Sequence, residues 1–156
     1  MVGVDILGGA IRADIMKLTK NFSLEEMYRS DTAQRCGIDN KPQTEEVVEN
    51  LRALCLEVLQ PLRDHLGKPV VVSSGYRCKD LNKKVGGVEN SQHLKGEAAD
   101  IKVRDREELI DVMRYIMDET DFDQLIREKS GSTEWVHVSH KRNGNNRRMV
   151  LRTKKN

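Results

Sequence analysis

The ten residues from Ser91 to Asp100 place a histidine and an aspartate on either side of a glycine. An apolar segment, residues 101–103, follows directly, so the chain passes from a polar loop into a strand. Gly96 would let the backbone reverse between His93 and Asp100, which are too far apart to share one helical turn. On this interpretation His93 comes from the loop and Asp100 from the strand that follows it.

A second polar group, Glu134-Trp135-Val136-His137, opens a segment whose alternation predicts a strand. A catalytic zinc site needs three protein ligands and one open position, and commonly uses two neutral imidazoles and a carboxylate. His93, Asp100 and His137 supply that set. Glu134 is the candidate general base. Because residues three apart on a flat strand face opposite ways, Glu134 has to sit where the chain bends into the strand.

Each of these residues has a simpler interpretation when it is taken singly. A histidine beside glycine in a polar loop is usually exposed, and Asp100 alone is a common strand-edge carboxylate. Glu134 could belong to a solvated loop. His137 is harder to dismiss, because it shares a predicted strand face with Trp135, where an unliganded imidazole would still need a hydrogen-bond partner. It is the joint pattern that indicates a metal site.

Hydrophobic spacing and capping signals predict an α+β domain with a small, mostly antiparallel sheet and flanking helices. Ser23 and Glu26 have the spacing of a capping box. We expect helices beginning at residue 23 and over residues 44–62, 79–84 and 105–117, with Pro61 loosening the second. Strands are expected over residues 70–72, 98–103, 123–127 and 135–140, with residues 148–152 as a hairpin arm after a turn at Asn143-Gly144.

The composition indicates one soluble globular domain. With 156 residues, of which 37% are apolar and 33% charged, the chain can bury a core without disulfide bonds. Cys36, Cys55 and Cys78 are odd in number and lack C-x-x-C spacing, so neither a disulfide framework nor a thiolate zinc site is predicted, and Cys55 is assigned to the core. Met16 resembles a natural first residue of the protein. Residues 1–15 are therefore expected to be a disordered leader or an alternative start, ahead of a single domain over residues 16–156.

The partners that the composition favours are few. A formal net charge of +2 does not indicate nucleic acid, although the basic segment 141–155 would predict salt-dependent DNA binding as a weaker hypothesis. We expect no membrane association, since no transmembrane run is present. A monomer is also expected. No signal peptide is recognised either, so the location stays open between the cytoplasm and release by a holin-type route.

The joint pattern resembles the signature of the zinc D-Ala-D-Ala peptidases, S-x-H-x-x-G-x-A-x-D followed by E-W-x-H. Every fixed position is present, as Ser91, His93, Gly96, Ala98, Asp100, Glu134, Trp135 and His137. The segment from Ser74 to Arg77 also matches the S-G-Y-R of that family. The family includes bacterial DD-carboxypeptidases, vancomycin-resistance D,D-dipeptidases and phage endolysins, and the resemblance extends from about Phe22 to Ser139.

The resemblance implies a fold shared with hedgehog signalling proteins and a Zn2+ ion on the three ligands named above. Glu134 would act as general base and then acid, and Arg77 would steady the developing oxyanion, because a guanidinium stays charged and offers fixed donors. Without the family, Arg77 would be read as a surface ion-pair partner. Ser91, Tyr76 and Trp135 would bind substrate or orient the site. His140 is expected to point away from His137 toward the surface.

The function expected from the resemblance is hydrolysis of peptide bonds in peptidoglycan stem peptides. The bond cleaved stays open among carboxypeptidase, dipeptidase and endopeptidase types, which differ in the loops that close the cleft; here these are residues 86–90 and 129–133. The alternative is a zinc-stabilised binding module of the same fold without turnover. The presence of both Glu134 and Arg77 argues against that alternative.

Overall fold

A computed structural model of the chain describes residues 6–7, 10–11 and 16–153. The short strands Ile6–Leu7 (β1) and Ala10–Ile11 (β2) pair antiparallel. The rest of the expected leader lies outside the described residues, so the prediction that it is disordered is not tested. Among the described helices, none has the length and apolar character needed to cross a membrane.

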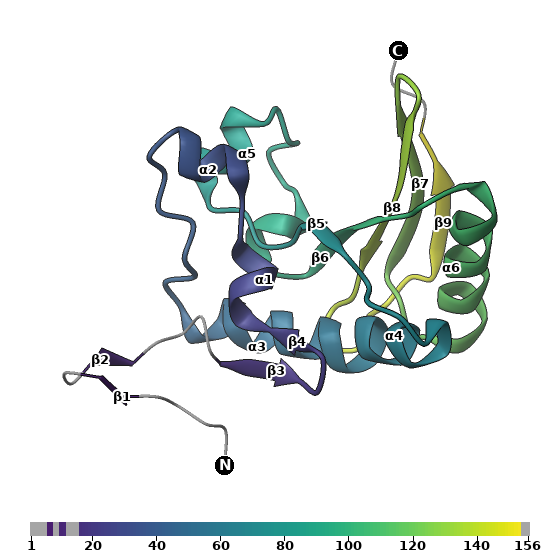
Figure 1. The fold of residues 1–156 in the computed structure, drawn as a ribbon, viewed down its shortest axis with the longest axis horizontal. Coiled ribbons are helices and arrows are strands. Elements are labelled where there is room, and N and C mark those ends of the chain that lie inside the picture. The colour runs from purple at the N-terminus through teal and green to yellow at the C-terminus, as the bar shows by residue number, and fades with distance from the viewer. Residues whose placement is uncertain (1–5, 8–9, 12–15, 154–156) are drawn as a thin grey trace.

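The centre of the fold is a five-stranded sheet with the strand order β5-β6-β8-β7-β9 (Figure 1). The neighbours β5/β6, β6/β8 and β8/β7 are antiparallel, and β7/β9 is parallel. This confirms the predicted α+β class with a mostly antiparallel sheet. The strands are β5 (Val72–Ser74), β6 (Ala98–Lys102), β7 (Gln124–Ser130), β8 (Thr133–Ser139) and β9 (Met149–Arg152).

The prediction of a hairpin arm for residues 148–152 is wrong, because β9 pairs parallel with β7. The Arg147 guanidinium and backbone N–H are held by the Asp123 carboxylate, which immediately precedes β7. The Met149 N–H also donates to the Asp123 carbonyl oxygen at 2.9 Å. The chain therefore passes Gly144, returns to the first residues of β7, and enters β9 in the same direction as that strand.

The helices follow the predicted capping and apolar spacing. Ser23 and Glu26 form the predicted capping box at the start of α1. In the long helical run, the turn before Pro61 widens into a π-helical segment, as expected where proline removes a backbone donor. The helices are α1 (Leu24–Tyr28), α2 (Asp31–Arg35), α3 (Glu45–Leu54), η2 (Cys55–Leu59), α4 (Gln60–Leu66), α5 (Lys79–Lys84), η3 (Gln92–Lys95) and α6 (Arg106–Glu119).

One hydrophobic core joins the helices to one face of the sheet. In Figure 1, α6 packs beside β7 and β8, while α3 and α4 run along the lower edge of the molecule. Cys55 is fully buried there, as predicted, and the antiparallel pair β3 (Lys17–Thr19) and β4 (Phe22–Ser23) adds Leu18 and Phe22. From β8 the core receives Val136 and Val138, so His137 between them faces the opposite side of the sheet.

Candidate metal centre

His93, Asp100 and His137 converge in space although 44 residues separate the first from the last. Asp100 on β6 and His137 on β8 are directly opposite in the strand register, and His93 arrives from η3. Asp100 Oδ1 lies 3.0 Å from His137 Nδ1 and 3.3 Å from His93 Nε2. One ligand atom from each residue lies within 4.8 Å of the other two, so the three can reach a common ion.

The orientation of the His93 ring is determined by its surroundings. Its Nδ1 lies 2.6 Å from the Gly75 carbonyl oxygen, which places the ring proton on Nδ1 and directs the lone pair of Nε2 toward Asp100. Ser91 accepts a hydrogen bond from the His93 backbone N–H at 3.1 Å and begins the turn of η3. Gly96 ends that turn with φ 74°, and a Cβ there would lie 2.8 Å from the Val47 carbonyl oxygen.

Asp100 carries a negative charge in a mostly buried position, with its side chain 12% exposed. Burial alone would raise the pKa of the Asp100 carboxyl, but its hydrogen bonds with His137 and His93 outweigh burial and hold that pKa well below the usual range. The cluster therefore offers one ionised carboxylate and two imidazole nitrogens. These donors fit a zinc ion, which takes nitrogen and oxygen ligands in this combination.

Arg77 lies at the rim of the cluster, three residues after the end of β5. Its Nη2 is 3.5 Å from Asp100 Oδ2, and its Nε donates to Ser74 Oγ at 3.0 Å. Burial lowers the pKa of the Arg77 guanidinium, and the nearby carboxylates of Asp100 and Glu128 oppose that shift. An arginine so placed remains charged at neutral pH.

Asn82 holds the Arg77 guanidinium in place and Gly87 leaves room for this contact, and neither residue was identified from the sequence. The buried Asn82 side chain accepts from Arg77 Nη1 at 2.9 Å and donates to the Val88 carbonyl oxygen at 2.9 Å. A Cβ at Gly87 would overlap Asn82 Oδ1 and lie 2.7 Å from Arg77 Nη1. A lone asparagine in a short helix gives no sequence signal for such a role.

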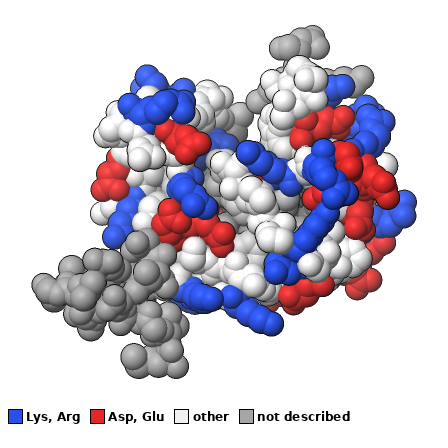
Figure 2. All heavy atoms as spheres, viewed as in Figure 1, with Lys and Arg blue, Asp and Glu red and all other residues white. Residues whose placement is uncertain are grey.

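A cavity of about 570 Å³ opens above the cluster, between the loop after α5 and one face of β7 and β8. Figure 2 shows that this side of the molecule is hollowed between these two parts. Ser91 and Trp135, both expected near the site, line the cavity with the three ligands and Arg77. Tyr76 does not line it; its backbone N–H donates instead to the Met27 carbonyl oxygen at 2.7 Å.

The structure does not bring Glu134 to the cluster, which corrects the position expected for it. Glu134 already lies inside β8, opposite Lys129, so the predicted bend into the strand is absent. Its carboxylate accepts from Arg127 Nε at 2.8 Å and from Arg106 Nη2 at 3.5 Å, on the helix side of the sheet. The hydrogen bond from Arg127, followed by that from Arg106, lowers the pKa of Glu134 and makes it a weaker proton acceptor.

Glu128 on β7 occupies the place where sequence reasoning had put Glu134. It is opposite Trp135 in the register, and it lines the cavity. Its Oε1 lies 3.8 Å from His137 Nδ1, and its side chain is 18% exposed. The alternation of residues 124–130 would have identified Glu128 once the pairing of Ile126 with His137 was known.

The prediction that His140 is a surface residue is wrong, because His140 is buried. It does point away from the cavity. Its ring Nδ1 lies 2.6 Å from the Asp121 carbonyl oxygen, and its backbone N–H donates to the Glu97 carbonyl oxygen at 2.9 Å. His140 therefore anchors the end of β8 and contributes no ligand to the cluster.

Comparison with known proteins agrees with this geometry. A family model described as Peptidase M15 matches residues 20–139, which is more than half of the chain and includes all the cavity residues from Arg77 to His137. A zinc D-Ala-D-Ala carboxypeptidase from Streptomyces albus G is 46% identical over 44 residues, or 28% of this chain. That match spans 17% of the length of the Streptomyces protein.

Proposed function

The chain belongs to the peptidase M15 family, and we therefore propose that it is a zinc-dependent peptidase that cleaves peptidoglycan stem peptides ending in D-Ala-D-Ala. The observation that carries this proposal is the convergence of His93, Asp100 and His137 beneath an open cavity with Arg77 at its rim. A carboxypeptidase or an endopeptidase would use the same residues.

The metal would be held by His93 Nε2, Asp100 Oδ1 and His137 Nδ1, the three atoms that face one another. Bound there, zinc would act as a Lewis acid. It would polarise the substrate carbonyl and lower the pKa of a bound water to roughly 7. The Gly75 carbonyl oxygen keeps His93 in the tautomer that this coordination requires. The cavity gives the fourth position access to substrate.

We assign the general base to Glu128 in place of Glu134, the residue predicted from the sequence. Glu128 takes a proton from water as the water oxygen bonds to the carbonyl carbon, and then delivers it to the amine nitrogen as the C–N bond breaks. Its position on the cavity side, 3.8 Å from His137, supports this role. Arg77 directs its guanidinium at the charge that develops on the carbonyl oxygen.

The test is digestion of purified peptidoglycan by the zinc-loaded protein, followed by mass spectrometry of the released muropeptides. Loss of a terminal D-alanine would identify a carboxypeptidase, and shortened cross-links would identify an endopeptidase. The His93→Ala variant should release nothing. Unchanged muropeptides with one zinc bound per wild-type chain would reject the peptidase and favour the zinc-stabilised binding module.

A further inference from the structure

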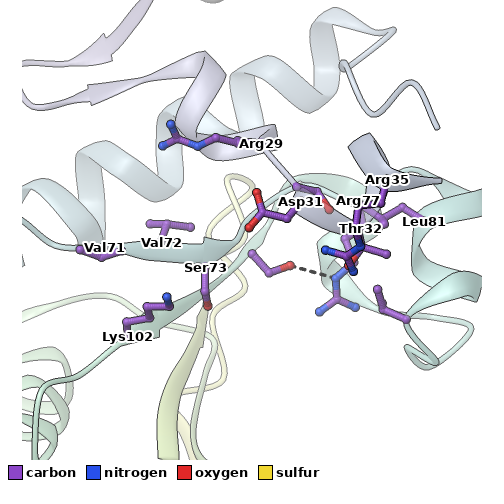
Figure 3. Close-up of a pocket in the computed structure, with 13 residues that line it drawn as sticks. Arg29, Asp31, Thr32, Arg35, Val71, Val72, Ser73, Arg77, Leu81 and Lys102 are labelled. Carbon is purple, nitrogen blue, oxygen red and sulfur yellow. Dashed lines mark hydrogen bonds between the residues drawn. The ribbon is translucent and has the colours of Figure 1, made fainter. Parts of the chain in front are cut away.

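A second cavity of about 570 Å³ lies beside the metal centre, on the other side of Arg77. One wall is the connection between α1 and α2, and the other is β5 with the residue before it (Figure 3). Arg77 and Val85 line both cavities, so the two adjoin at the arginine. We call this second cavity the basic pocket.

Positive charge is in excess in the basic pocket. Arg29, Arg35 and Lys102 line it together with a single acid, Asp31, while the fourth cation, Arg77, is offset by Asp100. Arg29 lies 3.6 Å from Glu25. In the described part of the chain, neither Arg35 nor Lys102 forms an ion pair with a carboxylate. Figure 3 shows Lys102 beside β5, and Arg35 at the same end of the pocket as Arg77.

The wall formed by β5 is also the edge of the sheet. Among the strands that the structure describes, β5 pairs only with β6 and is first in the strand order, so none of them lies along its other side. An extended peptide can lie along such an edge and bond to its backbone, while pockets beside it select side chains. The edge at Val72 and Ser73 leads directly toward Arg77 and the metal centre.

We propose that the basic pocket binds a carboxylate on the peptide substrate, at a residue on the N-terminal side of the cleaved bond. This inference rests on the proposed function, because it takes the substrate to be a peptide whose scissile carbonyl lies beside Arg77. The peptide then runs from the metal centre past Arg77 along β5, and it passes Arg35 at the Arg77 end of the pocket before it reaches Lys102 beside β5 (Figure 3). The position of its acidic group along this path determines which of the two cations it faces. Two cations without a carboxylate partner, Arg35 and Lys102, suit an acidic group on a peptide and give no continuous basic stripe for nucleic acid.

The test compares pairs of fluorescent peptides that end in D-Ala-D-Ala and differ only by a carboxylate or a carboxamide, placed at successive upstream positions. Dissociation constants are measured by anisotropy on the zinc-loaded Glu128→Gln protein, and KM and kcat on the wild type. We expect the best acidic peptide to bind about three- to tenfold more tightly than its amide in low salt, and the preference to shrink as salt rises.

The variants Lys102→Gln and Arg35→Gln should each reduce this preference, and the double variant should abolish it. Arg114→Gln, which removes an exposed arginine of α6, is the matched control and should keep it. Equal affinity for acid and amide at every position, or a preference that survives the double variant, would overturn the inference. Selective binding without cleavage would reject the proposed function alone, and cleavage without selectivity would reject the basic pocket alone.

Discussion

Glu134 and His137 lie on opposite faces of β8. His137 points into the cavity with Trp135, while Glu134 is bound to Arg127 on the helix side. Residues three apart in an extended strand must separate in this way unless a bulge intervenes, and β8 pairs without interruption from Thr133 to Ser139. The carboxylate on the cavity side comes from the neighbouring strand, and it is Glu128.

This geometry predicts different outcomes for two conservative variants. Glu128→Gln should lower kcat by about 10²- to 10⁴-fold, the usual contribution of a positioned general base, while zinc still binds. Glu134→Gln should change kcat less than about threefold, since it removes only a partly exposed ion pair with Arg127. Steady-state kinetics on a D-Ala-D-Ala peptide, with zinc content measured on the same samples, checks both values. The assignment fails if the larger loss belongs to Glu134→Gln.

Zinc should stabilise the folded chain, because the ligands converge only when β6, β8 and η3 are in place. At a zinc concentration 100 times the dissociation constant, linkage gives about 2.7 kcal/mol. For a domain of this size, that corresponds to a rise in Tm of roughly 5 to 10 °C. Thermal unfolding with zinc and with a chelator measures the difference.

The matched histidine variants make the zinc prediction specific. His93→Ala should remove the rise in Tm. His65→Ala should keep it, because that imidazole stacks on Tyr115 at 4.4 Å and pairs with Asp111, away from the cluster. An equal rise in both variants would mean that zinc binds elsewhere.

Asp123 should make stability depend on pH in the acid range. Burial alone would raise the pKa of its fully buried carboxyl, but hydrogen bonds from Arg147 outweigh it and lower that pKa to about 2. A lowered folded pKa stabilises the protein above the unfolded value, and this stability is lost as pH falls from about 4 to about 2. We expect Asp123→Asn to cost about 1 to 2 kcal/mol at pH 7, because solvent screens the half-exposed Arg147.

The deficit of Asp123→Asn should largely disappear near pH 2, where about half of the wild-type carboxyl groups are protonated in the folded protein and nearly all are in the unfolded chain. Urea unfolding at both pH values measures this convergence, with Asp118→Asn on the exposed face of α6 as the control. Hydrogen exchange should also accelerate at Met149, whose N–H bonds to the Asp123 carbonyl oxygen. A constant deficit at both pH values would show that the loss does not come from the ionised pair.

The sequence predicted those parts of the fold that depend on local spacing. The capping box at Ser23, the apolar face of the long helix with Cys55 and the loop-to-strand passage at Asp100 are all present. Each follows from periodicity or from a short motif whose physical cause lies within a few residues. The three residues that converge in the cluster were also identified from the sequence, because the whole motif fixes residue type and spacing together.

The errors occurred where long-range pairing decides the outcome. Asn143-Gly144 is a hairpin signal, but the pair of Arg147 with Asp123 directs the following strand to β7. Likewise, alternation tells which residues share a face, but not which neighbouring strand lies beside them, so Glu128 could not be placed without the register. His140 was misjudged because the carbonyl that satisfies its ring belongs to residue 121, in another part of the chain.

The last prediction concerns the contact that positions Arg77. Gly87→Ala should force the Arg77 guanidinium and Asn82 apart, because the added methyl group would overlap Asn82 Oδ1. If Arg77 acts on charge that develops at the carbonyl oxygen, as proposed, its displacement should lower kcat more than it raises KM, by roughly tenfold or more. Val88→Ala, in the same loop but with its side chain 73% exposed, should leave kcat within about twofold. Zinc affinity should be equal in both, because the shift leaves the ligands in place; reduced zinc binding by Gly87→Ala would point to a collapsed loop instead of a misplaced arginine.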